Sequence, residues 1–485
     1  MDWLRKIIIA LVAFLMSLIS DLFGQTNQVP QSWTLQTCIE YAMQNNIQIK
    51  QQILNEELAR QEVIRSKCSL LPSLNANASQ GYNWGRNVDR YTNQFSESQV
   101  QSNNFSLSSQ VTLFNGFQQY NNLRQSQLNL QAGKFDTEKL KNDIALGIAT
   151  AYLNILFCQS LKDNASLQLK ATQEQLEITK KKVNAGSLSE LNLLNIEAQY
   201  ASEELQLTNA DNQLTMAYLT LIQMLDLKNS KDFKIVEPQL TITGTPELLK
   251  TPEEIFNASV NKMPEIKASE YRIKAAQKSL QISRGGLLPT LSLQGSLGTG
   301  YSDGSKEVIG STMGGFQTIG TVVGTNQQVI STIPSLEYNY ATKSFENQIN
   351  DNLSKSLSFN LSIPIFNGYQ VRSSISRAKI NLKQAEYNND LQKNQLFKSI
   401  QQANTDAIAA LKKYYSAEKA YTAYKSAYTQ IEQKYSLGSA SFFEFTDAKS
   451  KYTKAQNELT QAKFDYIFKT KVIDFYLGNP IKLDN

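Results

Sequence analysis

The sequence Phe114-Asn115-Gly116 occurs a second time as Phe366-Asn367-Gly368. Seventy residues after the glycine of the first triplet comes Ala185-Gly186-Ser187, and seventy after that of the second comes Leu437-Gly438-Ser439. Both recurrences are separated by 252 residues (368 − 116 and 438 − 186). The stretch between triplet and second glycine is long, polar and almost free of Gly and Pro. We therefore interpret the chain as one unit duplicated, with very long helices in each copy.

Upstream of each triplet, apolar residues recur at every second position. A third repeated motif, Leu70-Leu71-Pro72-Ser73-Leu74 and Leu287-Leu288-Pro289-Thr290-Leu291, opens this part of each copy. One face of each alternating segment is apolar, and the other holds Ser, Asn, Thr and Gln without charges. A half-exposed soluble sheet would usually carry charged residues on its wet face, so the pattern favours tilted strands that cross a membrane. The predicted strands are about 73–84, 104–113, 290–301 and 356–365.

The strand ends and their connections fit the same interpretation. Tyr82, Trp84 and Tyr301 lie at the strand ends distal to the helices, where an interfacial girdle of aromatic residues is expected. Polar loops are predicted at 85–103 and 302–354, the second long and rich in Gly, Ser and Thr.

In the remaining segments, apolar residues recur with the spacing of an α-helix. A helix of 67 residues, such as each one that follows Phe-Asn-Gly, spans about 100 Å at 1.5 Å per residue. The helices that return after Gly186 and Gly438 keep apolar residues at 3-4 spacing, which predicts a left-handed coiled coil. In the first of them Glu203 interrupts the apolar seam. The predicted helices are 34–71, 117–183, 188–228, 253–284, 369–435 and 440–476.

The N-terminus has the pattern of a secretory signal. Arg5 and Lys6 precede the apolar stretch 7–19, and Phe23-Gly24-Gln25 is a suitable cleavage site. No cysteine follows the apolar stretch, so no N-terminal lipid anchor is expected. Beyond it no run of about 20 apolar residues occurs, so no membrane-spanning α-helix is expected either. The predicted organisation is a signal peptide 1–24, a first repeat 25–228, a connector 229–252, a second repeat 253–478 and a tail 479–485.

Composition argues against several classes of function. The chain has no histidine, no Gly-rich phosphate loop and no metal-ligand spacing, so we expect neither an enzyme nor a metal or cofactor site. The net charge of +5 forms no basic cluster, which gives no support for nucleic-acid binding. The three cysteines, Cys38, Cys68 and Cys158, are too few and too far apart for a disulfide framework, and we expect small buried apolar side chains there.

Four strands cannot close a barrel, and an open sheet edge in lipid leaves backbone groups unsatisfied. Three copies would supply twelve strands around a polar lumen. The duplicated Leu-Leu-Pro entries, the Phe-Asn-Gly strand-to-helix transitions (Phe114, Asn115, Gly116, Phe366, Asn367, Gly368) and the glycine helix turns make the chain resemble the TolC-type outer-membrane efflux channel family over about 34–480. The resemblance implies a homotrimer with a twelve-stranded transmembrane β-barrel in outer-membrane lipid and a long α-helical coiled-coil barrel in the periplasm of a Gram-negative-type bacterium. It also implies partners, namely a periplasmic adaptor and an inner-membrane pump of RND or ABC type.

By the same resemblance, a gate follows the second glycine turn. It would comprise Tyr435, Glu444 and Asp447, and threefold symmetry would gather six carboxylates into a cation-attracting ring that raises its own pKa values. Asn192 and Asn195 stand at the corresponding positions of the first repeat. Ala440 stands where the family often has an arginine, so an arginine latch is not expected. The glycine turns would form the periplasmic tip to which the adaptor docks, through Ala185, Gly186, Ser187, Leu188, Leu437, Gly438 and Ser439.

The expected function is export of small molecules such as drugs and toxic compounds through an outer-membrane channel, without any chemical step. Type I protein secretion and metal-ion efflux are alternatives within the same class, although the scattered methionines disfavour metal export. From another class, a structural trimeric coiled-coil protein of the cell envelope stays open as an interpretation.

Overall fold

The computed structural model describes residues 32–85, 87–88, 95–96, 99–228, 233–238 and 250–479. The predicted signal segment 1–24 lies outside these residues, as do most of the tail 479–485 and much of the connector 229–252. The chain forms two compact units. The helical unit comprises the chain up to Gln52 with Thr137–Met263 and Gln395–Asn485, and the sheet unit comprises Ile53–Asp136 and Pro264–Asn394.

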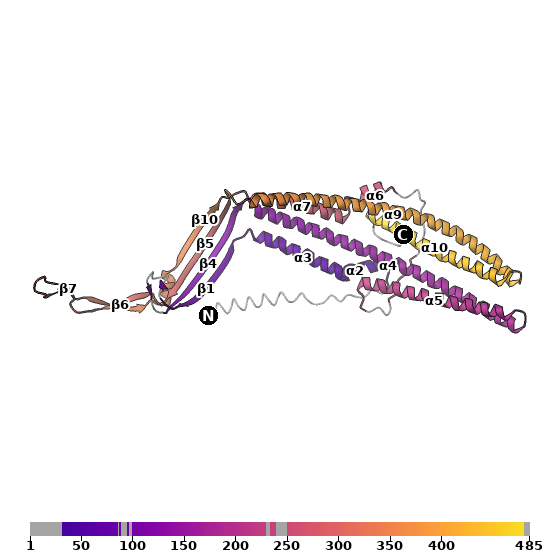
Figure 1. Ribbon diagram of the computed structural model, residues 1–485, viewed down its shortest axis with the longest axis horizontal. Coiled ribbons are helices and arrows are strands. Elements are labelled where there is room, and N and C mark those ends of the chain that lie inside the picture. The colour runs from indigo at the N-terminus through magenta and orange to yellow at the C-terminus, as the bar shows by residue number, and fades with distance from the viewer. Residues whose placement is uncertain are drawn as a thin grey trace. The chain divides into compact units, whose positions relative to one another are not determined.

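The sheet unit contains one four-stranded antiparallel sheet of order β1-β4-β5-β10. Figure 1 shows the four strands side by side, and each of the two repeats supplies a hairpin. Their register aligns apolar residues on one face, as in Leu107 opposite Leu297 and Leu293 opposite Phe359. The strands are β1 (Ser73–Asn83), β4 (Val100–Asn115), β5 (Thr290–Ser302) and β10 (Ser354–Ser362).

The predicted polar loop 302–354 is wrong as a description of that segment, because it folds into strands and a short helix. The strands pair as two antiparallel ribbons, β6 with β9 and β7 with β8. Glycines and a register shift in each ribbon break the strict alternation that would have indicated strands in the sequence. The elements are β6 (Lys306–Met313), β7 (Thr318–Thr321), β8 (Gln328–Ile330), β9 (Leu336–Thr342) and α8 (Phe345–Asp351). In the loop 85–103, β2 (Asn87–Val88) pairs with β3 (Phe95–Ser96).

After its strands, each repeat forms a pair of long helices, one outgoing and one returning, and the corresponding helices of the two repeats are equal in length. The outgoing helices α4 (Gln118–Asn184) and α9 (Gln370–Ser436) have 67 residues each, and the returning helices α5 (Glu190–Leu225) and α10 (Phe442–Leu477) have 36 each. The first part of α4 and of α9 belongs to the sheet unit and the rest to the helical unit.

The two predicted helices that precede the strands are each divided in the structure. The first is divided into α2 (Leu35–Asn45) and α3 (Ile47–Cys68). The division occurs at Asn46 because its side chain caps α3, accepting hydrogen bonds from the backbone N–H groups of Gln48 (2.9 Å) and Ile49 (3.3 Å). The second is α6 (Pro252–Ser259) and α7 (Pro264–Gly285), divided where Pro264 begins a new helix.

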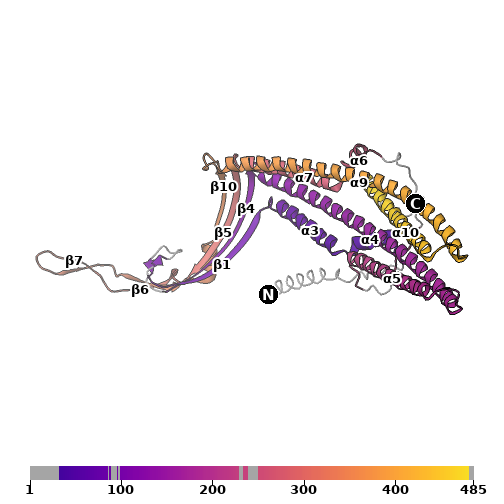
Figure 2. The ribbon, with the colours of Figure 1, turned by 45° about the vertical axis from the view of Figure 1, so that its right-hand side comes forward.

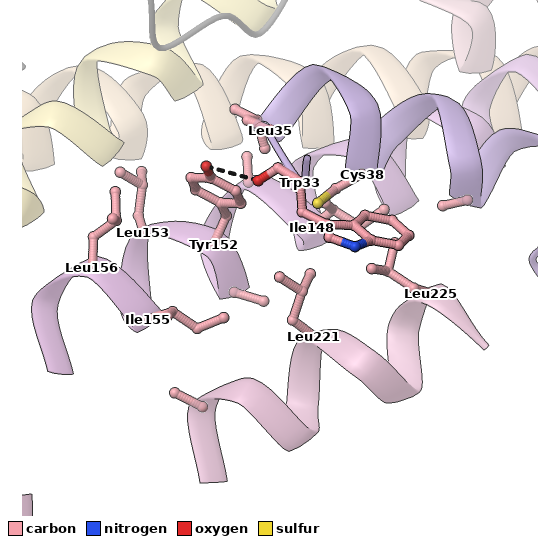
Figure 3. Packing of buried hydrophobic residues seen from close by; sticks show 14 of the residues in the cluster. Trp33, Leu35, Cys38, Ile148, Tyr152, Leu153, Ile155, Leu156, Leu221 and Leu225 are labelled. Carbon is pink, nitrogen blue, oxygen red and sulfur yellow. Dashed lines mark hydrogen bonds between the residues drawn. The ribbon is translucent and has the colours of Figure 1, made fainter. Parts of the chain in front are cut away.

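The main core lies in the helical unit, where α2, α4 and α5 meet (Figure 3). Tyr152 of α4 donates a hydrogen bond of 3.2 Å to the backbone oxygen of Trp33, and Trp33 also packs on Phe233 of the connector. Part of α4 is apolar and long enough to cross a membrane, which departs from the sequence-based expectation, but half of that 18-residue window is buried within the protein. Its residues supply this core, so the helix is accounted for without a membrane.

The cysteines divide between core and surface. Cys38 and Cys158 are buried as expected, and burial raises the pKa of the Cys38 thiol to about 12. Cys68 is exposed at the end of α3, contrary to the expectation that all three are buried.

Candidate functional site

The sheet carries an uncovered apolar face. Leu74, Leu357, Phe359 and Leu361 are each more than 60% exposed, although all lie on strands. Burying such side chains is worth about 25 cal/mol per Å² of apolar area, so a sheet that leaves them in water would be poorly stable. This face therefore requires lipid or protein against it.

The opposite face of the sheet is polar and uncharged. Across it run rows such as Ser108–Ser296–Ser356, in which the Ser296 and Ser356 hydroxyls are 2.7 Å apart. The four strands contain one charged residue, Lys355, which is the second residue of β10 and whose register partner Leu297 places it on the apolar face. A face of small hydroxyl and amide groups can be wetted without a fixed charge.

Aromatic side chains gather at the distal end of the sheet, as the sequence indicates. The rings of Tyr82 and Trp84 stack with centroids 6.3 Å apart, and both side chains are exposed. Tyr301 packs instead on Phe345 of α8, with centroids 5.5 Å apart. Phe345 is itself half exposed and adds an aromatic side chain at this end that the sequence reasoning missed, since it lies in the segment predicted to be a polar loop.

The two Phe-Asn-Gly triplets precede their helices with similar positive φ values, although Phe114 and Asn115 belong to β4 whereas β10 ends at Ser362, short of the predicted strand end at 365 and before Phe366. Gly116 and Gly368 have φ of 65° and 58°, and the next residues, Phe117 and Tyr369, also have positive φ. A Cβ atom on Gly116 would lie 2.3 Å from the backbone oxygen of Gly285, so this turn packs backbone to backbone on the end of α7. No atom within the described chain comes within 4 Å of a Cβ on Gly368.

The two glycine turns that end α4 and α9 are also alike. Gly186 and Gly438 have φ of 73° and 75°. The backbone N–H groups of Ser187 and Ser439 donate to the oxygens of Lys182 (2.9 Å) and Lys434 (2.8 Å), five residues earlier, as in a Schellman motif. Beside them Leu437 is 83% exposed, Leu188 is half-buried, and Ala185 is exposed.

The candidate gate acids begin α10. Glu444 forms a capping box with Ser441, because its Oε2 atom accepts from the Ser441 backbone N–H (2.7 Å) while its own backbone N–H donates to the Ser441 hydroxyl oxygen (3.2 Å). The Ser441 hydroxyl also lies 2.9 Å from Glu444 Oε2 as a donor. These hydrogen bonds, the backbone one first, lower the pKa of Glu444 within one chain. Asp447, one turn further on, forms an exposed ion pair of 2.7 Å with Lys451.

Tyr435 belongs to an aromatic ladder between α9 and α10. Its ring stacks on Phe445 with centroids 4.7 Å apart, and one heptad earlier Tyr428 stacks on Tyr452 at 5.3 Å. Burial raises the pKa of Tyr435, whereas a side-chain hydrogen bond with Gln175 of α4 opposes the rise. The tyrosine predicted at the gate is therefore held by both helix pairs.

The first-repeat counterparts of the acids make only local contacts. Asn192 Nδ2 donates 3.1 Å to the Ser189 hydroxyl, whereas Glu444 accepts from Ser441, and Ser189 makes no side-chain capping hydrogen bond at the start of α5. Asn195 is exposed. Within one chain the predicted acids lie one turn apart on α10, and a ring of them would require three copies.

A buried ion pair, which the sequence reasoning missed, joins the two helix pairs. Lys449 Nζ of α10 lies 2.9 Å from Glu203 Oε1 of α5, and their side chains are 9% and 1% exposed. Gln168 and Gln199 donate to the same oxygen at 3.0 and 2.6 Å, and Thr172 of α4 contacts both charged groups. The interruption of the apolar seam at Glu203 was the available signal, because a carboxylate in a coiled-coil seam requires a buried partner.

Comparison with known proteins decides the family. The family model described as outer membrane efflux protein matches residues 38–226 and 257–479. The chain belongs to the outer membrane efflux protein family. Its TolC-type fold, mainly α with strands that form part of a transmembrane sheet, is confirmed, and the chain is an outer membrane protein.

Individual relatives are distant in sequence but alike over nearly their whole length. Outer membrane protein TolC of Escherichia coli is 22% identical over 465 residues, which is 93% of this chain and 83% of TolC. The crystal structure of the outer membrane protein VceC of Vibrio cholerae matches with a TM-score of 0.71 at 14% identity, covering 92% of this chain and 97% of VceC. The outer-membrane channel OprN matches with a TM-score of 0.70 at 18% identity, covering 92% and 90%. At the level of the family these are channel proteins rather than enzymes.

Proposed function

We propose that three copies of the chain form a closed channel through the outer membrane. In this channel the apolar sheet faces lie against lipid and the polar faces line a lumen. The observation that carries the proposal is the four-stranded sheet itself, uncharged on its polar face, bare on its apolar face and unpaired at the outer edges of β1 and β10 within the described chain. Unpaired edges in lipid are prohibitively costly, and threefold repetition closes them.

The duplication suggests how neighbouring copies meet. In one chain the turn at Gly116 packs on Gly285, and a Cβ on Gly285 would lie 2.7 Å from Gln118 Cγ. The second-repeat counterparts of Gly116 and Gln118 are Gly368 and Gln370, and the first-repeat counterpart of Gly285 is Cys68 (285 − 68 equals 287 − 70). Gly368 is open and Cys68 is exposed. If the contact recurs between copies, Gln370 of one copy meets Cys68 of the next.

The cargo of the channel is proposed to be small molecules, delivered by an inner-membrane pump through a periplasmic adaptor that docks at the tip. Family membership and the uncharged lumen face support this proposal. The exposed leucine and small residues around Gly186 and Gly438 offer the adaptor a surface at the helix turns. A relative that is 25% identical over 171 residues, covering 35% of each chain, is a pyoverdine export outer membrane protein of Pseudomonas aeruginosa.

The assembly is tested by a disulfide between copies. Gln370→Cys, with native Cys68 retained, is expected to give cross-linked dimers and trimers on oxidation, whereas Gln370→Cys with Cys68→Ser gives none. The same purified protein, inserted in a planar bilayer, is expected to pass ionic current. A protein that is monomeric by native mass spectrometry and passes no current would exclude the channel, and a conducting trimer without the disulfide would exclude only this contact.

A further inference from the structure

The ribbon formed by β6 and β9 with their extension β7 and β8 contains an uncharged stretch of unusual length. From Val308 to Leu336 the sequence has no Asp, Glu, Lys or Arg, while Glu307 and Glu337 stand at its two ends. Figure 2 shows the ribbon projecting from the distal end of the sheet. Such a segment in water would normally carry charges, so its composition requires an explanation.

The base of the ribbon is held firmly to the sheet. The buried side chain of Gln348 in α8 accepts from the Ser302 backbone N–H (2.9 Å) and donates to its oxygen (2.8 Å), which fixes the end of β5. Across the base, the backbone N–H of Lys343 donates 2.9 Å to the Ser305 oxygen, and the Lys343 ammonium pairs with Asp351. The ribbon therefore leaves the sheet in a defined direction and presents defined faces.

The two faces of the β6–β9 ribbon differ in polarity. In the register, Val308 opposes Tyr340, Ser311 opposes Tyr338 and Met313 opposes Leu336, which gathers large apolar side chains on one face. The opposite face pairs Thr312 with Glu337 and Gly310 with Asn339. The apolar face is bare, since its exposed fractions are Val308 53%, Tyr340 62%, Tyr338 52%, Met313 81% and Leu336 53%.

A two-stranded ribbon with one bare apolar face is marginal in water and requires a second layer. Lipid does not supply that layer under the proposed membrane placement, because the aromatic girdle at Tyr82, Trp84 and Tyr301 precedes the ribbon along the strands. Three charged residues lie at the base of the ribbon: Asp303 just after β5, Lys306 at the start of β6 and Lys343 just after β9. A charged base beyond the interfacial girdle puts the ribbon in water, outside the bilayer.

We propose that the apolar face of the β6–β9 ribbon packs against the ribbons of the other two copies, so that three ribbons form a shared apolar cap over the outer mouth of the channel. The proposal rests on the trimer of the proposed function. The argument for this occupant is continuity, because the ribbon lies between β5 and the edge strand β10, whose free side is where a neighbouring copy joins. Threefold symmetry places three identical apolar faces around one axis, and in the proposed cap each face turns toward that axis and covers another without any further partner.

The test uses two adjacent residues on opposite faces. Ser311→Cys and Thr312→Cys, both exposed in the single chain, are made in the Cys68→Ser background and treated in outer membranes with a short bifunctional maleimide. Ser311→Cys is expected to link copies into dimers and trimers in at least several-fold higher yield than Thr312→Cys. Adding Tyr338→Ser and Tyr340→Ser to Ser311→Cys is expected to lower that yield several-fold without loss of the trimer.

The outcomes separate the cap from the channel. Equal linking at the two positions, or no linking at either in a protein that is trimeric and conducts current, overturns the cap and leaves the proposed function intact. Linking of Ser311→Cys to a protein of different mass in whole cells also overturns it, in favour of an external partner. A protein that is not trimeric by native mass spectrometry and passes no current contradicts the proposed function itself, whatever the linking at the ribbons.

Discussion

Gly186 and Gly438 end the long helices with a left-handed backbone, and apart from the adjacent residues no atom of the described chain lies within 4 Å of a Cβ built on either. Backbone conformation alone therefore requires glycine there. We expect Gly186→Ala or Gly438→Ala to lower the free energy of unfolding by about 1–2 kcal/mol, the cost of a left-handed conformation for an L-residue. Denaturant titration in detergent measures this.

The matched control for these turns is Gly133→Ala inside α4. A Cβ there also meets open space, but the backbone is helical, so the variant should be neutral or more stable by about 0.5–1 kcal/mol. A loss at Gly133 equal to that at Gly186 would mean that close packing, rather than the sign of φ, excludes alanine.

Glu203 and Lys449 make a second residue-scale prediction. Removing one partner leaves the other buried and uncompensated, so Glu203→Gln or Lys449→Met should cost about 3–5 kcal/mol of unfolding free energy. The double variant Glu203→Leu/Lys449→Met should recover most of that loss, because no buried charge is then left without a partner.

The comparison for the buried pair is Asp143→Asn, which breaks the exposed pair of Asp143 with Lys139 (2.5 Å). Exposed pairs contribute about 0–1 kcal/mol, so this change should be small. A double variant as unstable as the single ones would show that the site depends on hydrogen bonds to Gln168, Gln199 and Thr172 rather than on charge.

At the scale of elements, the period of the apolar residues was enough to predict the central sheet and the long helices, because one face of each element is consistently apolar. The breaks at Asn46 and before Pro264 depend on side-chain capping and on a helix start at proline, which a periodic pattern of apolar residues does not report. The strands of the ribbon were missed because glycines and register shifts interrupt their alternation.

The N-terminus of α10 offers a prediction in which two roles of Glu444 oppose each other. As a cap, Glu444 has a pKa below its usual 4.5, so its charge stabilises the fold above that pH, and the stabilisation is lost as pH falls through the lowered pKa. As a member of a carboxylate ring, it would have a raised pKa and destabilise the fold when charged. Thermal denaturation of wild type and Glu444→Gln at neutral and at acidic pH separates the two.

We expect Glu444→Gln to lower the melting temperature at neutral pH and to match wild type below the lowered pKa, as a cap requires. Glu254 in α6 is the control, because it forms the same capping box with Thr251 and its pKa is likewise lowered, yet no ring is predicted there. A Glu444→Gln trimer more stable than wild type, beside a destabilised Glu254→Gln, would assign Glu444 to a ring.

At the scale of the whole molecule, the candidate gate goes beyond what one chain can determine. The sequence places Tyr435, Glu444 and Asp447 near one turn, and the structure explains each by contacts inside the chain, namely an aromatic ladder, a capping box and an ion pair with Lys451. A constriction is a property of three copies around an axis. Its width is set by how the three copies are arranged, and ion flow through the assembly reports that width.

Ion selectivity is therefore the decisive whole-molecule measurement. If three copies bring six carboxylates to the lumen, the wild-type channel in a planar bilayer should prefer cations, and Glu444→Gln/Asp447→Asn should lose most of that preference. The matched control is Glu190→Gln/Glu197→Gln, which removes the same number of exposed charges from the start of α5 in the other repeat. Equal loss in both variants would reflect the general surface charge of the tip. Unchanged selectivity in the first would leave the channel standing and confine Glu444 and Asp447 to holding the beginning of α10.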